Sequence, residues 1–441
     1  MPPRKHRAVR RTWPQRLVLG FNSIVAFACI VSALTLLYAN NRLGSRKLVD
    51  ISAAVPDSTA NPSVPPTAGA ADSTSLPEIV VPAGDVGAKN FLLTASDARQ
   101  CIDPNSPDAG SYLGSGADIG ERADTIMMLR IDTETHQAAV LSFPRDLWVR
   151  IGTSNRKSRI NSTLDSNDPG KIIATMFTNF GLQVDHLINV DFCAFKGLVD
   201  AVGGVAVPFE YAARDRATGL DVPAECHLFT GDEALRYVRS RKYQYFDPAK
   251  NEWVSDGTSD LGRITRQQDF LKRTLQKALD KGARDLRVAN RLINTSLQYV
   301  VTDTNLTPDV MLQVANAMKD FDPATVKTFQ VDGRPRNISG NSVLEPIIDS
   351  ENMKAVLAVF RGQARIADAP DIVATDPNAT TTTTTTSATS GSTTTVGGGS
   401  PSTVGGSAST TTTAEPASTL PIVAVDENIK GLYPPRDLSC R

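Results

Sequence analysis

Alternating runs of apolar and polar residues divide the middle of the chain into short strands and longer helices. Runs rich in Leu, Ile and Val predict strands at NFLLTAS, DTIMMLRID, AAVLSFP, HLINVDF and VAVPF. Apolar residues at helical spacing predict helices over 169–181, 194–204, 230–240, 260–281 and 308–318. Strands mixed with helices of this length predict an α/β fold, an α-β-α sandwich around a central mixed sheet.

The helix predicted over 230–240 has a defined start. Thr230 stands three residues before Glu233, which is the spacing of a capping box. Its surface and the start of the next helix carry an unusual number of guanidinium groups in a chain whose net charge is −1. These residues are Arg236, Arg239, Arg241, Arg263 and Arg266. Such a cluster indicates a local anion site, whereas a nucleic-acid surface needs a broadly basic face, so no nucleic-acid partner is expected.

A long apolar run near the N-terminus predicts a membrane anchor. Residues 17–38 carry no charge and are numerous enough to cross a bilayer. The preceding leader, 1–16, is basic, so the positive-inside rule places the N-terminus in the cytoplasm and the rest of the chain outside. A cleaved signal peptide is the alternative, but the apolar run is longer than a usual h-region and no small-x-small site follows. We therefore expect a single-pass protein of the cell membrane.

Composition sets the remaining boundaries. Residues 39–86 are rich in Pro, Ala, Ser and Thr and predict an extracytoplasmic stalk, followed by a folded domain over 87–362. Residues 363–418 are dominated by Thr, Ser and Gly and predict a disordered spacer, with an O-glycosylated spacer as the alternative. A short tail, 419–441, closes the chain, and the sequence leaves open whether it docks on the domain or binds something else.

The five cysteines predict no metal site, because none has metal-ligand spacing. Cys101 and Cys226 lie in polar, loop-like stretches of the exported part, so a disulfide between them is a candidate. Cys193 lies in an apolar helix start and is expected to be a buried thiol.

Most familiar catalytic motifs are missing: there is no GxGxxG, Walker loop, HExxH or GxSxG. His136 and His186 flank predicted strands and look like ordinary edge residues, which disfavours histidine-based catalysis. What remains is a set of Asp and Arg residues at strand ends, including Asp97, Asp124 and Arg145. Any one such pair alone is more often a surface salt bridge.

Taken together, the strand-end residues predict a site for a metal-bound pyrophosphate. Mg²⁺ favours carboxylate and phosphate oxygens, and arginine matches phosphate oxygens with a two-pronged fork. Asp97 and Asp124 would hold Mg²⁺ (or Mn²⁺). The phosphates would be held by Arg145, Arg239, Arg241 and Arg263. The apolar segments MFTNFGL and CAFKGLVDAV raise the alternative of a lipid-borne pyrophosphate, which needs an apolar cleft beside the arginines, but packing of helix faces in the core explains each segment better.

Seven stretches in order resemble the LytR-CpsA-Psr family of cell-envelope proteins. They are LLTASDAR, ERADTIMML, LSFPRD, RINST, NVDFCAFKGLVDAVGGV, TGDEALRYVRSR and SDLGRITRQQ, and they run from about Asn90 through Leu279. The resemblance implies a membrane-anchored phosphotransferase acting in cell wall biogenesis. It would move a phosphoglycosyl polymer, such as arabinogalactan or another wall polymer, from a polyprenyl-pyrophosphate carrier to a peptidoglycan hydroxyl. Its expected partners are that lipid-linked glycan, peptidoglycan and membrane lipid.

The resemblance also implies roles for individual residues. Asp97 and Asp124 are expected to bind the metal, with Arg145 and Asp260 completing the catalytic group. The expected pyrophosphate ligands are Arg122, Arg145, Arg239, Arg241, Arg263 and Gln267, with Arg266 as a weaker candidate. Two departures are visible: a long insertion separates Asp97 from Asp124, and RINST has Arg159 where a lysine is expected.

Two other functions use the same residues. A polyprenyl-pyrophosphate pyrophosphatase would differ only in taking water as the acceptor. A non-catalytic lipid-pyrophosphate scaffold would need the arginines but not Asp97 and Asp124. A DNA-binding regulator is disfavoured, because only about sixteen residues are expected in the cytoplasm.

Overall fold

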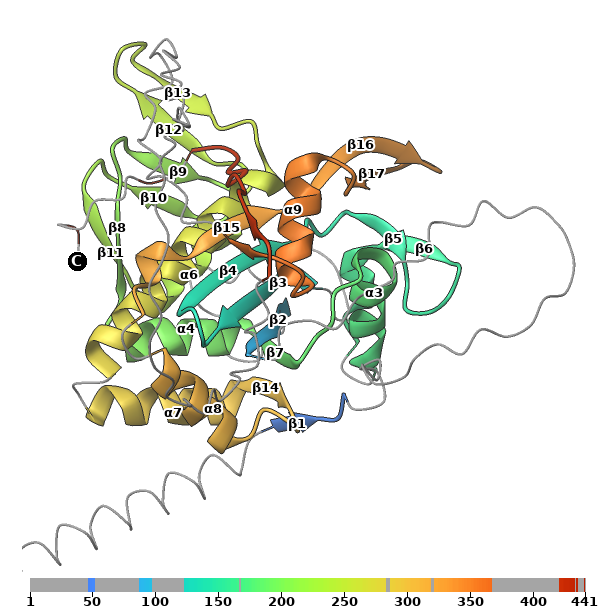
Figure 1. The fold of residues 1–441 in the computed structure, drawn as a ribbon. Helices are drawn as coiled ribbons and strands as arrows, with labels where there is room; N and C mark the ends of the chain where they lie inside the picture. Colours follow the sequence, from blue (N-terminus) through green and yellow to red (C-terminus); the bar gives the residue numbers. More distant parts are fainter. Residues whose placement is uncertain are drawn as a thin grey trace, which may run out of the picture.

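Strand β2 lies in the middle of a seven-stranded mixed sheet in the computed structural model (Figure 1). The structure describes residues 47–51, 87–96, 123–165, 168–282, 286–318, 321–366, 420–432, 434 and 440. The strand order is β1-β14-β7-β2-β3-β4-β15, with β1/β14, β7/β2 and β4/β15 parallel and the other pairs antiparallel. The strands are β1 (Lys47–Val49), β2 (Ala88–Ser96), β3 (Ala123–Asp132), β4 (Gln137–Ser142), β7 (His186–Val190), β14 (Val300–Asp303) and β15 (Lys327–Gln330).

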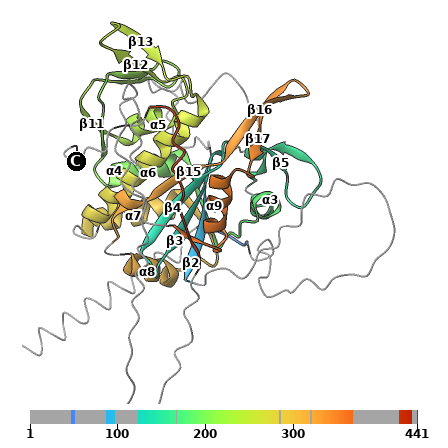
Figure 2. The same cartoon turned by 45° about the horizontal axis from the view of Figure 1, so that its top comes forward.

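Helices cover both faces of this sheet. Ile126 and Met128 of β3 are buried in one cluster with residues of α3 and α9, whereas Met127 between them is buried with residues of α6 and α8. Alternate side chains of a strand face opposite sides, so these clusters are two layers. Figure 2 shows the two helical groups on either side of the strands. The bounds are α3 (Gly170–Phe180), α6 (Asp260–Gly282), α8 (Pro308–Ala317) and α9 (Glu351–Phe360).

A second core fills the space between the remaining helices and the smaller sheets. Phe229, Tyr237 and Phe270 form its aromatic centre, with ring centroids 5.1 to 6.2 Å apart. It packs α4 (Phe192–Ala201), α5 (Gly231–Arg239) and α6 against β8 (Val205–Pro208), β11 (Cys226–Phe229) and the sheet β10-β9-β12-β13. The strands of that sheet are β9 (Ala213–Asp215), β10 (Leu220–Val222), β12 (Gln244–Asp247) and β13 (Glu252–Ser255). Two hairpins pair β5 (Trp148–Arg150) with β6 (Lys157–Arg159) and β16 (Asp332–Ile338) with β17 (Asn341–Ile347). Further helices are α7 (Leu286–Tyr299) and the short η1 (Ile160–Thr163) and η2 (Pro323–Thr325).

The mixed α/β fold with a central mixed sheet is therefore confirmed. All five predicted helices form within a few residues of their expected bounds, and the capping box of Thr230 and Glu233 is present at α5. Four of the five predicted strands join the central sheet. VAVPF is the exception, because β8 pairs with β11 in a separate ladder.

The N-terminal expectations meet the structure only in part. The stalk prediction is wrong for residues 47–51: β1 pairs with β14 at the sheet edge, and Ile51 is buried in the core. Among the described residues, no helix is long and apolar enough to cross a membrane. The predicted anchor, 17–38, and its basic leader lie outside the described residues.

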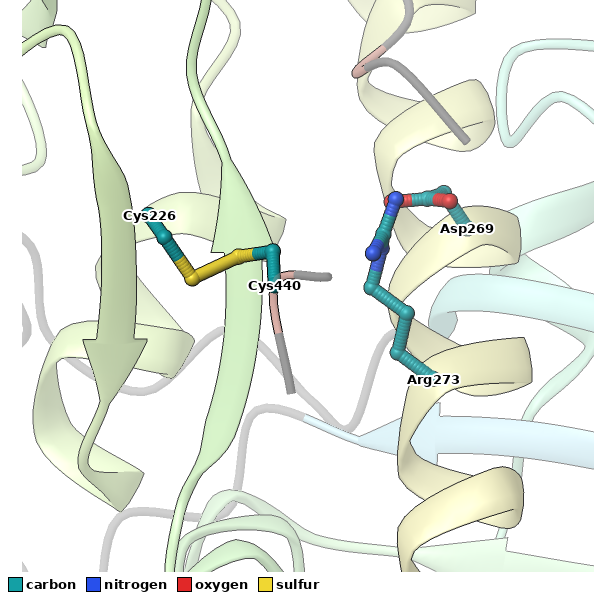
Figure 3. Close-up of a disulfide and its surroundings, with 4 residues drawn as sticks. All are labelled: Cys226, Asp269, Arg273 and Cys440. Carbon is teal, nitrogen blue, oxygen red and sulfur yellow. A yellow bond between two sulfur atoms is a disulfide. The ribbon is translucent and has the colours of Figure 1, made fainter. Parts of the chain in front are cut away.

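The C-terminal segment docks on the domain, which answers a question the sequence left open. β18 (Arg365–Ile366) pairs in parallel with β19 (Ile422–Val423), so the folded unit extends beyond the predicted boundary at 362. Cys226 is bonded to Cys440, so the expected Cys101–Cys226 disulfide is wrong (Figure 3). Cys193 is also disulfide-bonded rather than a free thiol, whereas Cys101 lies outside the described residues.

Candidate active site

Asp124 and Arg145 meet at one edge of the sheet because β3 and β4 are antiparallel neighbours. Met127 of β3 is paired with Ser142 of β4, so the start of β3 and the residues after β4 lie at the same end. There Arg145 Nη1 donates a hydrogen bond to Asp124 Oδ1 at 2.8 Å. The topology thus joins two of the strand-end residues that the sequence singled out.

The first turn of α6 adds an arginine and a carboxylate to this pair. Arg263 Nη2 donates to the backbone carbonyl of Asp124 at 2.8 Å and lies 2.9 Å from Asp260 Oδ1. Asp260 Oδ1 is in turn 3.8 Å from Arg145 Nε. Two carboxylates and two arginines therefore alternate in one group, here called the carboxylate–arginine quartet. Arg263 is only 2% exposed, so its charge is held inside the protein.

The quartet sets the ionisation of its own members. Burial raises the pKa of Asp124, but the charges of Arg263, Arg145 and Arg241, with the hydrogen bond from Arg145, outweigh burial and leave that pKa below its usual value. Burial lowers the pKa of Arg263, against the opposing effect of Asp260 and Asp124. Burial also acts to lower the pKa of Arg145, but Asp124 and Asp260 raise it above its usual value. Asp124 is thus ionised at neutral pH.

Several polar atoms of the quartet are buried without a hydrogen bond. They are both carboxylate oxygens of Asp260 and the Nε atoms of Arg145 and Arg263. Arg159, whose Nε is 3.4 Å from Asp146 Oδ1, has the same unbonded Nε nearby. Buried polar atoms in folded proteins are normally hydrogen-bonded, and a group of exceptions in one place calls for an explanation. The oxygens of a bound anion would accept hydrogen bonds from the arginine Nε atoms, and a bound cation or a hydroxyl donor would complete the Asp260 oxygens.

Arg241 approaches the quartet from the loop after α5. Its charge acts on the pKa values of both Asp124 and Arg263. The loop is held by Asp215 of β9, which is 1% exposed and accepts hydrogen bonds from residues 240–242 at 2.7, 3.0 and 2.8 Å. A buried carboxylate therefore fixes the backbone that presents Arg241.

Gln267 and Arg239 flank this arrangement. Gln267 stands one turn along α6 from Arg263, and its Nε2 donates to the carbonyl of Val238 at 3.0 Å. The Gln267 Oε1 atom is buried without a hydrogen bond. The guanidinium of Arg239 lies over the ring of Phe192, with 4.9 Å between its central carbon and the ring centroid.

Arg266 has a different position. It is 1% exposed, Nη1 is 3.1 Å from Asp256 Oδ2, and Nη2 donates to the carbonyl of Ser240 at 2.7 Å. Its guanidinium also lies over the ring of Tyr243, at 4.5 Å. With both terminal nitrogens engaged, Arg266 braces α6 against the loop of Arg241 instead of facing the quartet. The weaker expectation for Arg266 as a ligand stays a prediction.

The sequence from residue 66 to residue 360 matches the model of the LytR_cpsA_psr family. This chain belongs to that family. The matched part contains every member of the quartet and the loop that presents Arg241.

Two curated relatives show how far the similarity extends. The chain is 32% identical over 213 residues to the probable cell wall biosynthesis protein LcpB of Corynebacterium glutamicum, covering 48% of this chain and 46% of LcpB. It is 28% identical over 214 residues to the polyisoprenyl-teichoic acid–peptidoglycan teichoic acid transferase TagU of Halalkalibacterium halodurans, covering 46% of this chain and 66% of TagU. The chain thus spans about half to two thirds of the length of these relatives.

Solved structures with similar folds include other proteins of this family. A LytR-Csp2A-Psr enzyme from Actinomyces oris is 19% identical, with 63% of this chain and 91% of that chain covered and a TM-score of 0.48. TagV of Bacillus subtilis is 18% identical, with 63% of this chain and 98% of that chain covered and a TM-score of 0.48.

The donor set of this LytR_cpsA_psr member fits a hard divalent cation. Asp124 is ionised, and Asp260 has two oxygens without hydrogen bonds; carboxylate oxygens of this kind are what Mg²⁺ and Mn²⁺ bind. Within the described ranges, no group of three or more His, Cys, Asp and Glu residues is arranged as a metal site. The expected ligand Asp97 and the expected phosphate ligand Arg122 lie outside these ranges.

Five of the predicted residues gather in one place: Asp124, Arg145, Arg241, Asp260 and Arg263. The sequence did not identify the carboxylates that position Arg241 and Arg266. Asp215 ends the three-residue strand β9 and Asp256 directly follows the short strand β13, and only the fold brings them to 240–242 and Arg266. Asp146 stands next to Arg145 in LSFPRD, and the structure places it within 3.7 Å of Arg145 Nε and 3.4 Å of Arg159 Nε.

Proposed function

We propose that this protein is a membrane-anchored phosphotransferase of cell wall biogenesis. It moves a phosphoglycosyl polymer, arabinogalactan or another wall polymer, from a polyprenyl-pyrophosphate carrier to a peptidoglycan hydroxyl. The observation that carries this proposal is the carboxylate–arginine quartet with its buried, unbonded polar atoms. The names of the relatives, a peptidoglycan teichoic acid transferase and a probable cell wall biosynthesis protein, support the same class of reaction.

In this proposal Arg145, Arg241 and Arg263 bind the pyrophosphate oxygens, with Arg159 and Gln267 at the margin. Arginine fixes a phosphate through two parallel hydrogen bonds, so the arginines orient the reacting phosphorus as well as neutralising it. A bound Mg²⁺ (or Mn²⁺), held by Asp97 and Asp124, would supply further neutralisation of the phosphoryl oxygens. Much of the charge that develops in phosphoryl transfer is thus met by groups already in place.

The transfer itself exchanges one phosphorus–oxygen bond for another. The acceptor hydroxyl oxygen bonds to the glycan-linked phosphorus, the bond to the bridging oxygen breaks, and polyprenyl phosphate leaves. The acceptor proton passes to a carboxylate. Asp124 is a poor acceptor because its arginine neighbours lower its pKa. Asp260, with both oxygens lacking a hydrogen bond, is the better candidate.

The remaining parts of the proposal concern location. The reaction takes place outside the cell membrane, with the N-terminus in the cytoplasm and residues 17–38 as the single anchor. The lipid carrier would approach from the outer leaflet, and no nucleic acid takes part.

The test uses the full-length protein in detergent with a synthetic polyprenyl-pyrophosphate glycan, Mg²⁺ and peptidoglycan fragments. Mass spectrometry would detect a phosphodiester-linked product and free polyprenyl phosphate. Arg263→Ala is expected to abolish product, while Arg273→Ala, which removes an arginine from the same helix but pairs with Asp269, is the matched control. Figure 3 shows that control pair on α6.

Three outcomes distinguish the candidate functions. Linked product from the wild type and the control, but not from Arg263→Ala, supports the transferase. Phosphorylated glycan released into solution without linkage would mean a pyrophosphatase. Binding of the lipid without turnover, unchanged in Asp124→Ala, would mean a scaffold.

A further inference from the structure

The C-terminal segment lies beyond the part of the chain that matches the family, and it contacts elements that support the candidate site. Residues 420–432 with Cys440 are here called the C-terminal strap. It follows the edge strand β15, where Glu427 Oε1 accepts hydrogen bonds from Thr328 N at 2.6 Å and Thr328 Oγ1 at 2.8 Å. Asn428 exchanges three hydrogen bonds with Gln330. Figure 1 draws the strap in dark red beside β15.

The same strap residues also reach α6. Glu427 Oε1 lies 3.6 Å from Lys272 Nζ, and the Glu427 side chain is 3% exposed, so this charge is inside the protein. The backbone N–H of Lys430 donates to Thr265 Oγ1 at 3.2 Å. The strap therefore ties the sheet edge to the helix that carries Asp260 and Arg263.

Gly431 packs against the segment whose carboxylate, Asp256, holds Arg266. Its φ is +76°, and a Cβ at this position would come within 2.7 Å of Asp256 Oδ1 and closer still to Thr258 Oγ1. Asp256 is the carboxylate that holds Arg266, and Arg266 in turn bonds to the carbonyl of Ser240. One residue of the strap is thus packed against a chain of contacts that ends next to Arg241.

A covalent bond fixes the far end of the strap. Cys440 is 7% exposed and is joined to Cys226 at the start of β11 (Figure 3). Val425 is buried in the core beneath the sheet, and Leu432 packs against the second core. The strap is therefore anchored at both ends and in the middle, and Gly431 lies between these anchors.

We propose that the C-terminal strap is a positioning element of the arginine cluster. Gly431 and the Cys226–Cys440 bond hold Asp256 and Thr258, and through Arg266 the 240–242 loop, in the arrangement that presents Arg241 to a pyrophosphate. That the bound ligand is a pyrophosphate rests on the proposed function. The positioning itself does not, because it is a mechanical link between two parts of the chain.

Gly431→Ala is the variant that tests this link, and Gly340→Ala is its matched control. Gly340 has a similar φ of +79° but lies in the β16–β17 turn, where an added Cβ would meet nothing within 4 Å. Binding of inorganic pyrophosphate with Mg²⁺ would be measured by calorimetry on the full-length protein. Gly431→Ala is expected to bind about tenfold more weakly, the size of effect of one disturbed hydrogen bond to a charged group, and Gly340→Ala is expected to bind as the wild type does.

Hydrogen exchange supplies a readout that does not depend on the ligand. Gly431→Ala is expected to speed exchange at 240–242 and in the first turn of α6, whereas Gly340→Ala leaves both unchanged. Because coupling between two sites is reciprocal, pyrophosphate should also slow exchange in 425–432 of the wild type. Cys440→Ser, which frees the strap without adding a Cβ, should change affinity and exchange in the same direction.

The outcomes separate this proposal from the proposed function. If the wild type binds no pyrophosphate, the proposed function fails and exchange at 240–242 alone decides the role of the strap. Lower thermal stability in Gly431→Ala, with affinity and exchange at 240–242 unchanged, would show that the strap only stabilises the fold. Equal losses in Gly340→Ala and Gly431→Ala would overturn the proposal as well.

Discussion

Arg145 donates a hydrogen bond to Asp124 at 2.8 Å, and this contact joins the segment that follows β4 to the start of the neighbouring strand β3. The pair is stable because Arg263 also binds Asp124, through the backbone carbonyl, and is itself paired with Asp260. Each guanidinium is thus oriented by carboxylates before any ligand arrives. Preorganised charge of this kind is what a site for a pyrophosphate requires.

Replacing Arg263 by lysine should abolish most of the activity even though the charge is kept. Arg263 Nη2 makes both contacts, to the Asp124 carbonyl and to Asp260, and Arg263 Nε is buried without a hydrogen bond. A lysine ammonium could replace Nη2 in these contacts, but it lacks the other nitrogens of the planar guanidinium fork that bind a phosphate. We expect transfer to fall about 100-fold, the usual cost of losing one donor that stabilises developing charge. The measurement is product formation by mass spectrometry. Arg273→Lys, on the same helix, should retain wild-type activity, and a fully active Arg263→Lys protein would remove the fork from the mechanism.

Much of the fold could be predicted because its elements carry strong local signals. The capping box at Thr230 and the long apolar periodicity of α6 do not depend on the rest of the chain. The strand β1 could not be found in the same way. It is three residues long and forms only because β14, more than 250 residues later, offers a free sheet edge.

The sequence predicted the charged residues of the site but not the contacts that hold them in place. Asp124, Arg145, Asp260 and Arg263 are visible as strand-end and helix-start residues in the sequence. The disulfide was not predictable, because Cys226 and Cys440 are 214 residues apart and the partner choice depends on where the strap docks.

The pKa of Asp124 makes a stability prediction. Its arginine neighbours outweigh burial and lower the pKa below the usual 3.8, so the stabilisation is complete above that value and is lost as the pH falls through the lower, folded-state pKa. Urea unfolding of the wild type should therefore become easier below about pH 4. Asp124→Asn should lack this acid-sensitive component. Glu351→Gln, at an exposed position of α9, should keep the wild-type profile.

Asp215 offers a test of the loop that presents Arg241. Its Oδ2 accepts three hydrogen bonds from residues 240–242, and the residue is 1% exposed. Asp215→Ala leaves these donors without a partner, so the free energy of unfolding should fall by about 3 kcal/mol. Affinity for pyrophosphate should fall as well. Denaturant titration measures the free energy of unfolding, and calorimetry measures the affinity for pyrophosphate. Asp221→Ala, on the neighbouring strand and exposed to solvent, should change neither quantity.

The disulfide can be tested through the coupling of its two cysteines. Each of Cys226→Ser and Cys440→Ser should lower the free energy of unfolding by about 2–4 kcal/mol, because either change opens the same cross-link. The double variant should be no less stable than the single ones, since contacting residues are not additive.

A second double-mutant cycle tests the Cys101–Cys226 disulfide that the sequence suggested. Cys226→Ser combined with Cys101→Ser should give the sum of the two single effects, because Cys226 is bonded to Cys440. Denaturant titrations of the four proteins, each kept under non-reducing conditions, provide the measurement. If Cys226 proved additive with Cys440 and coupled to Cys101, the strap would lose its covalent anchor. Gly431 would then be held near Asp256 by noncovalent contacts of the strap, among them those of Glu427, Asn428 and Lys430.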